Sequence, residues 1–292
     1  MLQIIDHIFY RDLSEEYPRI RIFRKCLLLY CVFFIIQSLF EYQLLFDPSA
    51  SFVLPAHPQG RSLLTLMNLL SLPTMENFTG LFFAVAGLSA LSGFFDFYPK
   101  ISLSLTFFTI TNIQNRIYPT LTGGDELLSM MLFYLIFISN GKKSACEIWE
   151  TTRKSLDRAF VFVCKAQLIL VYVISALFKW MSPEWLQGEA LSQILNTPEF
   201  SLFFLQPHLP AMHYFLAILT WLSLAYLSLF PIFIFIKPAR KNLLIIGLAF
   251  HACIAIFMGL LNFSLVMVCC YTLFYTPSFF SKIPALRPAQ NL

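Results

Sequence analysis

Apolar residues in this chain are gathered in long runs separated by shorter polar segments. The runs recur between residues 23 and 276 and approach the roughly 20 residues that an α-helix needs to cross a bilayer. The fourth run is short and the last two are almost continuous, so these two form either a re-entrant pair or one broken element. We therefore predict an all-α polytopic integral membrane protein with a single bundle of about six to eight transmembrane helices. The eight predicted spans are 23–45, 77–95, 101–117, 126–139, 159–180, 210–236, 243–260 and 262–276.

The residues before the first run follow another pattern. Acidic and apolar residues are mixed in 1–22, whereas a cleavable signal has a basic stretch followed directly by an apolar core, so we expect this segment to be retained. Its isoleucines recur at helical spacing, which suits an interfacial helix ending at Pro18. The predicted organisation is a cytoplasmic amino-terminal segment (1–22), one transmembrane domain (23–276) and a short cytoplasmic tail (277–292).

The distribution of basic residues predicts the orientation, because Lys and Arg in short loops are concentrated on the cytoplasmic side of a membrane. With the amino terminus in the cytoplasm, sixteen of the twenty Lys and Arg residues fall in inner segments, and only Arg61 and Arg116 fall in outer ones. Lys165 and Lys179 lie inside the fifth span. We therefore expect a multi-pass membrane protein with a cytoplasmic amino terminus.

Composition leads to the same class of protein. Hydrophobic residues make up 58% of the 292 residues and charged residues 12%, about half of what a soluble domain carries. The lipid bilayer is thus the first expected partner, and no nucleic-acid surface is expected, because the basic residues lie in the inner loops. The seven cysteines fall in spans or in an inner loop, so neither disulfides nor a metal site is expected.

Lys179 is the sharpest candidate for chemistry. A lysine within an apolar span is costly unless it has a role, and loss of water favours the neutral amine that acts as a base. The alternative is an anchor, because Lys179 lies at the outer end of its span, where a lysine extends its ammonium to the interface. Four polar residues share one stripe of this span at steps of seven, three and four: Lys165, Tyr172, Ser175 and Lys179.

Two further ionisable residues are candidates. The imidazole of His251, in the seventh span, can donate, accept or carry a proton, or it simply hydrogen-bonds a neighbouring helix. Asp125 follows two glycines where the fourth span begins, so its carboxylate either orients a base or caps the helix.

Several segments of the chain resemble the HTTM family, the horizontally transferred transmembrane domain shared with vitamin K-dependent γ-carboxylases. The resemblance covers roughly residues 20–276 and rests on RSLLTL (61–66), GGDELLSMMLFYLIF (123–137), QLILVYVISALFKWMSPEWLQGEAL (167–191) and FHACIAIFMGLLNFSLVM (250–267). The residues in the order and spacing of the family are Gln167, Tyr172, Lys179, Trp185, Gly188, His251, Gly259 and Phe263.

The resemblance implies a role for Lys179. In the carboxylases, a lysine in the segment matching VYVISALFKW is the proposed base, used with reduced vitamin K, oxygen and carbon dioxide to carboxylate glutamates. Two features depart from that pattern. The carboxylases have a large lumenal region after the membrane part, where this chain has a short segment, and Asp125 stands where they have a histidine.

Two functional hypotheses follow. The first is a quinol-linked membrane enzyme in which Lys179 is the base and His251 and Asp125 are further catalytic residues. The second is a non-enzymatic scaffold or accessory subunit that binds a lipid or a membrane or redox partner protein, with Lys179 as an anchor. In the first hypothesis a reduced quinone is the cofactor, held by Tyr172, Gln167, Trp185 and Asn262.

Overall fold

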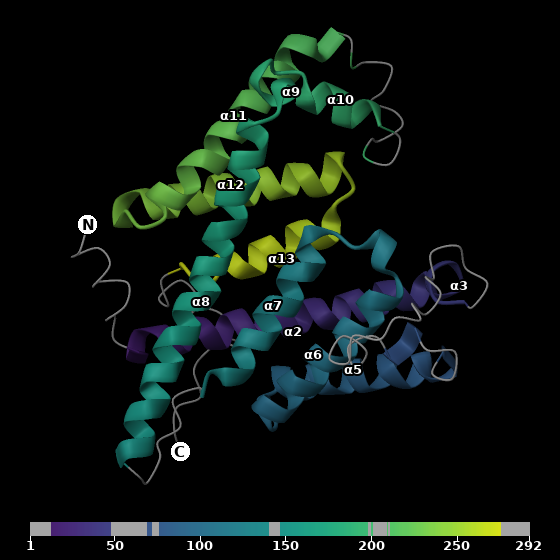
Figure 1. The fold of residues 1–292 in the computed structure, drawn as a ribbon, viewed down its shortest axis with the longest axis vertical. Helices are drawn as coiled ribbons and strands as arrows, with labels where there is room; N and C mark the ends of the chain where they lie inside the picture. Colours follow the sequence, from purple (N-terminus) through teal and green to yellow (C-terminus); the bar gives the residue numbers. More distant parts are fainter. Residues whose placement is uncertain are drawn as a thin grey trace. The chain divides into compact units, whose positions relative to one another are not determined.

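The computed structural model describes residues 13–47, 69–71, 76–139, 147–197, 200, 209 and 211–275. Within these ranges every regular element is a helix, as the sequence predicted (Figure 1). The eight longer helices are α2 (Leu13–Phe40), α5 (Thr79–Phe94), α6 (Pro99–Arg116), α7 (Gly123–Phe137), α8 (Glu147–Trp180), α11 (His213–Phe233), α12 (Lys237–Phe257) and α13 (Leu261–Tyr271). Short helices are α3 (Tyr42–Leu45), α9 (Pro183–Leu186) and α10 (Ala190–Asn196), with 3₁₀ turns at Leu69–Ser71, Glu76–Phe78 and Tyr118–Thr120.

Four of the described helices are long and apolar enough to cross a membrane, namely α2, α8, α11 and α12. Helices α5 and α13 are also apolar but shorter. Each of the eight predicted spans coincides with a helix, while the number of crossings, six to eight, stays a prediction.

The described helices form two compact units rather than the single bundle that the sequence predicted. Residues 13–160 make up the amino-terminal unit and residues 161–275 the carboxyl-terminal unit, so the boundary falls within α8. The sequence could not reveal this division, because hydropathy marks apolar segments but does not say which of them pack together. Each unit is described separately below.

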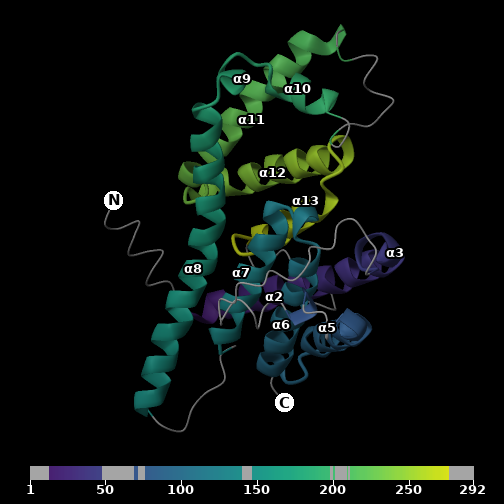
Figure 2. The same ribbon diagram turned by 45° about the vertical axis from the view of Figure 1, so that its right-hand side comes forward.

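The amino-terminal unit is built on α2, α5, α6 and α7, which pack against one another (Figure 2). The close approach of α5 and α6 is aided by small polar residues, and the hydroxyls of Ser89 and Thr106 lie 2.9 Å apart. Gly93 allows α5 to lie against α2, because a Cβ there would be 2.9 Å from Cδ1 of Leu28. The core of this unit therefore depends on small residues at the helix crossings.

Helix α2 corrects one prediction, since it begins at Leu13 and continues through Pro18. Pro18 therefore does not end an amino-terminal helix, although the sequence had predicted that it would. Because this proline lies in the second turn, it removes only one backbone hydrogen bond, and the apolar residues that follow, such as Phe23 and Leu27, are fully buried. The predicted interfacial helix itself lies outside the described residues.

Contacts within the amino-terminal unit join segments that the sequence analysis placed on the same side of the membrane. Arg24 of α2 pairs with Asp96, and both belong to predicted inner segments. At the predicted outer side, Arg116 donates to the carbonyl of Leu70 at 2.5 Å, and the amide of Leu69 donates to Asn112 at 2.7 Å. The alternation of sides in the predicted topology is consistent with these contacts.

The carboxyl-terminal unit contains α9 to α13 and the second half of α8. Helices α9 and α10 pack on α11, which packs on α12, and α12 and α13 lie side by side (Figures 1 and 2). The last two predicted spans are two separate helices, since α12 ends at Phe257 and Gly259 has a φ of +69°. Glycine adopts this left-handed conformation without steric cost, which permits the chain to reverse between them.

Candidate functional site

One face of α8 is buried in the carboxyl-terminal unit, and Lys179, the first candidate residue, lies near the end of this face. The buried side chains along it recur at steps of three or four residues: Val161, Cys164, Leu168, Tyr172 and Ala176. Lys179 occupies the next position on this face and is half-buried. The predicted stripe therefore combines a buried hydroxyl with a lysine about 10 Å further along the axis.

Tyr172 is hydrogen-bonded to side chains from two other helices. Its hydroxyl lies 3.0 Å from Nε2 of His251 in α12 and also contacts the hydroxyl of Tyr271 in α13. The hydroxyl of Tyr271 lies 2.9 Å from that of Tyr226 in α11. We call these four residues the tyrosine–histidine chain. It connects α8, α11, α12 and α13 through buried polar atoms.

Counting donors and acceptors gives this chain a direction. Nδ1 of His251 has no hydrogen-bond partner among the described residues. If Tyr226 donates to Tyr271, Tyr271 to Tyr172 and Tyr172 to Nε2, only an N–H at Nδ1 is left unpaired. The opposite direction would also leave the hydroxyl proton of Tyr226 without an acceptor. The arrangement with fewer unpaired groups therefore has the imidazole accepting at Nε2, which requires its neutral form.

Gly247 explains how the three hydroxyls reach one another. A Cβ at this position would overlap the hydroxyls of Tyr226 and Tyr271 and would lie 2.8 Å from Cε2 of Tyr271. Gly247 is one turn before His251 on the same face of α12, so the glycine leaves the space that the phenols occupy. Substitution by any other residue forces the phenols to move.

Aromatic rings enclose the tyrosine–histidine chain. Phe230 stacks on Tyr172 with ring centroids 3.8 Å apart, and Phe263 lies 5.6 Å from the His251 ring. Both His251 and Tyr172 are only 1% exposed. Hydrogen bonds in such an apolar environment are stronger than in water, and losing one partner is correspondingly costly.

Lys179 contacts another of the predicted site residues. Its Nζ lies 4.6 Å from the centroid of the Trp185 ring in α9, which begins directly after α8 ends. An ammonium over an indole face is attracted by the ring, and this stabilises the charged form of the lysine. The contact therefore favours a cationic anchor, whereas a base requires the neutral amine.

Two predicted cofactor contacts make no hydrogen bond to another described residue. Gln167 is half-buried on α8. Asn262, the second residue of α13, has its Oδ1 buried without a partner among the described residues. Both belong to the unit that holds Lys179 and His251. Their predicted contact with a cofactor stays a prediction.

Asp125 lies in the amino-terminal unit, at the beginning of α7. Its Oδ2 accepts hydrogen bonds of 2.8 Å from both the amide and the hydroxyl of Thr122, and Nε2 of Gln114 lies 3.3 Å from its Oδ1. This is the helix-capping role that the sequence analysis gave as the alternative. The catalytic role of Asp125 stays a prediction, and its observed partners do not require one.

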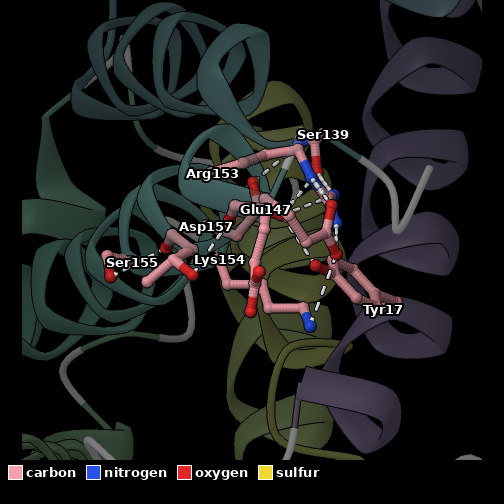
Figure 3. Close-up of polar contacts among 9 residues, drawn as sticks. Tyr17, Ser139, Glu147, Arg153, Lys154, Ser155 and Asp157 are labelled. Carbon is pink, nitrogen blue, oxygen red and sulfur yellow. Dashed lines mark hydrogen bonds and ion pairs between the residues drawn. The ribbon is translucent and has the colours of Figure 1, made fainter. Parts of the chain in front are cut away.

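A second buried polar cluster was not singled out from the sequence (Figure 3). Asp157 of α8 is fully buried and accepts hydrogen bonds from the amide of Ser139 at 2.8 Å, from its hydroxyl at 2.5 Å and from Tyr17 at 2.7 Å. Nη1 of Arg153 also lies 3.5 Å from Oδ2 of Asp157. Because the carboxylate is saturated with donors and ties α2 to the end of α7 and to α8, its role is structural.

Comparison with known proteins identifies the family of this chain. The HTTM domain matches residues 64–279, most of the chain. The chain belongs to the HTTM family. The match includes every predicted site residue, from Asp125 to Asn262, and so places the tyrosine–histidine chain within the HTTM domain.

Two relatives of this HTTM protein come from Bacillus subtilis (strain 168). The sporulation-delaying protein SdpB is 23% identical over 175 residues, which is 54% of this chain and 52% of SdpB. The uncharacterised protein YitO is 26% identical over 191 residues, which is 61% of each chain. This HTTM chain thus spans about half to three-fifths of the length of these relatives. No solved structure matches it.

Two members of the tyrosine–histidine chain, Tyr226 and Tyr271, were not predicted, although each carries a hydroxyl within an apolar segment (LSLAYLSLF and VMVCCYTLF). Such residues are a weak signal on their own, since tyrosine is frequent at membrane interfaces. Their depth relative to His251 depends on helix packing, which the sequence does not give.

Proposed function

We propose that this HTTM protein is a membrane enzyme that uses a lipid-soluble quinol, with the reacting groups in the carboxyl-terminal unit. The observation that carries the proposal is the tyrosine–histidine chain, whose Tyr172 shares a buried face of α8 with Lys179. Ionisable and hydroxyl side chains are costly in an apolar bundle, so a connected set of them points to a role in moving protons.

The chemistry fits the residues present. Oxidation of a quinol to a quinone releases two protons and two electrons, and the electrons pass to oxygen or to a redox partner in the membrane. In this proposal Lys179 takes a proton from the quinol, while the hydroxyls of Tyr172 and Tyr271 can each pass a proton towards Nε2 of His251. A base at the outer end of α8 is within reach of a quinol dissolved in the bilayer.

Purification in mild detergent, followed by mass spectrometry of small molecules, tests the proposal. We expect a stoichiometric quinone in the wild-type protein, and oxidation of a short-chain naphthoquinol when oxygen is supplied. Lys179→Ala should abolish the oxidation without loss of folded protein. Lys241→Ala, which removes an exposed lysine of α12, is the matched control and should retain full activity. Full turnover by Lys179→Ala would overturn the assignment.

The second candidate is a membrane scaffold or accessory subunit that binds a lipid or a partner protein. It is favoured by the contact between Lys179 and Trp185, because that contact stabilises a charged anchor. Lys179→Arg separates the two functions, since arginine stacks on the indole and stays charged but does not act as a base. Retained binding of the lipid or partner protein in this variant supports the scaffold, and loss of quinol oxidation supports the enzyme.

We also propose that the protein is a multi-pass protein of the bacterial inner membrane with a cytoplasmic amino terminus. The concentration of Lys and Arg in predicted inner segments supports the orientation. The bacterial source of both relatives supports the location in a bacterial membrane. Reporter fusions after residues 60, 98 and 140 provide the test. Fusions at 98 and 140 should report the cytoplasm and the fusion at 60 the opposite side, and any other pattern contradicts the topology.

A further inference from the structure

A cluster of three basic residues around one carboxylate lies in the amino-terminal unit, whereas the residues of the proposed function belong to the carboxyl-terminal unit. Asp96, in the turn between α5 and α6, is contacted by three side chains of α2. Nη2 of Arg21 lies 2.6 Å from Oδ2 and Nζ of Lys25 3.2 Å from the same atom, while Arg24 pairs with Oδ1. We call these four residues the basic cluster.

The charges of the basic cluster do not balance. Three cations share one anion, and among the described residues no other carboxylate forms an ion pair with Arg21, Arg24 or Lys25. Arg24 is only 2% exposed, and its Nε and Nη1 have no hydrogen-bond partner among the described residues. Unbalanced charge at low exposure is unfavourable, so the site favours a further anion.

The cluster is nevertheless accessible. The side chains of Arg21 and Asp96 are 29% and 26% exposed, which leaves an approach to the cations from outside the unit. The turn around Asp96 carries three strongly exposed aromatic side chains, Phe95, Phe97 and Tyr98, at 63%, 65% and 77%. Exposed aromatic rings beside basic residues are typical of a surface at the level of the lipid head groups.

The backbone of the turn holds this arrangement. Asp96 and Tyr98 have φ values of +66° and +44°, in the left-handed region that a bulky residue such as tyrosine rarely adopts. Hydroxyls of Ser92 and Ser102 donate to the carbonyl of Phe97 at 3.1 and 2.8 Å and fix the turn. The turn thereby directs the Asp96 carboxylate at α2 while leaving the aromatic rings exposed.

We propose that the basic cluster binds the phosphate of an anionic phospholipid head group, with Arg21 and Lys25 contacting the phosphate and the exposed aromatic rings lying among the acyl-chain carbonyls. The lipid, rather than a free phosphate ion, is the occupant because the apolar rings at 95, 97 and 98 flank the cations and would gain nothing from a soluble ion. Asp96 competes with the lipid phosphate for the same donors, so it sets the affinity.

Native mass spectrometry of the full chain, purified in detergent and mixed with phosphatidylglycerol or phosphatidylcholine, tests this site. Wild-type protein should retain phosphatidylglycerol in preference to phosphatidylcholine. Arg21→Gln should lower the retention of phosphatidylglycerol about five-fold, which corresponds to one lost contact between a basic residue and an anionic surface. Lys241→Gln removes an exposed charge from another predicted inner segment and should leave retention unchanged.

Asp96→Asn should change the retention of phosphatidylglycerol in the opposite direction. Removing the competing carboxylate should raise retention of phosphatidylglycerol above that of the wild type, although three ion pairs are lost. If the cluster only ties α2 to the turn, Arg21→Gln and Asp96→Asn will lower stability and neither will change lipid retention, which overturns the proposal. Displacement of the lipid by millimolar inorganic phosphate would assign the site to a soluble anion and would also overturn it.

Discussion

The hydroxyl of Tyr172 lies 3.0 Å from Nε2 of His251 and also contacts the hydroxyl of Tyr271, so one phenol connects an imidazole with a second phenol inside the carboxyl-terminal unit. Both partners are held by other helices, and a change at Tyr172 therefore affects α8, α12 and α13 together. Tyr172 lies in the middle of the tyrosine–histidine chain and Tyr226 at its end, so losing one hydroxyl should cost a different amount of stability from losing the other.

Tyr172→Phe should destabilise the protein more than Tyr226→Phe. The first change leaves both the acceptor of His251 and the donor of Tyr271 unpaired, at a cost of about 1–3 kcal/mol for each unsatisfied group, whereas the second removes only a terminal donor. Both variants keep the aromatic ring. Thermal unfolding in detergent provides the comparison, and equal losses in the two variants would contradict the central position of Tyr172 in the tyrosine–histidine chain.

Gly247→Ala should lower stability by about 1–3 kcal/mol, because the added Cβ overlaps the hydroxyls of Tyr226 and Tyr271. Adding Tyr226→Phe should recover part of this loss, so the double variant is more stable than the sum of the single changes predicts. Gly87→Ala is the control, since a Cβ there meets nothing within 4 Å. Strict additivity of the two changes would show that the overlap is relieved in another way.

Asp125→Ala should cost about 1 kcal/mol, as expected for loss of a helix cap, because its carboxylate accepts two hydrogen bonds from Thr122. Asp125→Asn keeps a carbonyl oxygen in the same place and should restore most of the stability. Chemical denaturation or thermal unfolding measures both. If Asp125→Asn folds normally but abolishes quinol oxidation, Asp125 has the catalytic role that the sequence suggested.

The stability of the amino-terminal unit should fall in acid through Asp96. Burial opposes ionisation of this carboxyl, but the hydrogen bond from Arg21, the charge of Arg24 and the hydrogen bond from Lys25 outweigh it and lower the pKa of Asp96. A lowered pKa in the folded state means that the stabilisation is complete above the pKa of the unfolded chain and is lost as pH falls through the folded one.

Unfolding temperatures measured between pH 7 and pH 3 check this dependence. Wild-type protein should lose more stability over the acidic part of the range than Asp96→Asn, in which the titrating group is absent. Parallel curves for the two proteins would mean that the ion pairs of Asp96 do not contribute to stability.

The sequence predicted the helices well, because the backbone N–H and C=O groups of an apolar run in a membrane must form hydrogen bonds within that run. All eight predicted spans are helical, and the two roles considered for Asp125 included the capping that the structure shows. The continuation of α2 through Pro18 was missed, because proline preferences describe a position without the burial of the residues that follow.

The site could be predicted only in part, since its residues meet through packing. Lys179 and Trp185 are six residues apart, and their contact follows from a short turn after α8. Tyr172 and Tyr271 are 99 residues apart, so no local pattern relates them. The division of α8 falls near residue 160, where the charged segment 147–158 gives way to an apolar one, but this change in hydropathy does not say that the two parts of the helix pack in different units.

Gly247 is part of a sequence feature that can be searched for in other HTTM proteins. Because the space beside α12 holds two phenol hydroxyls, a homologue that carries a larger residue at this position must have given up one or both of them. A glycine at 247 together with tyrosines at 226 and 271 then becomes a diagnostic signature. It would separate family members that keep the hydrogen-bonded chain from members that have replaced it by ordinary apolar packing.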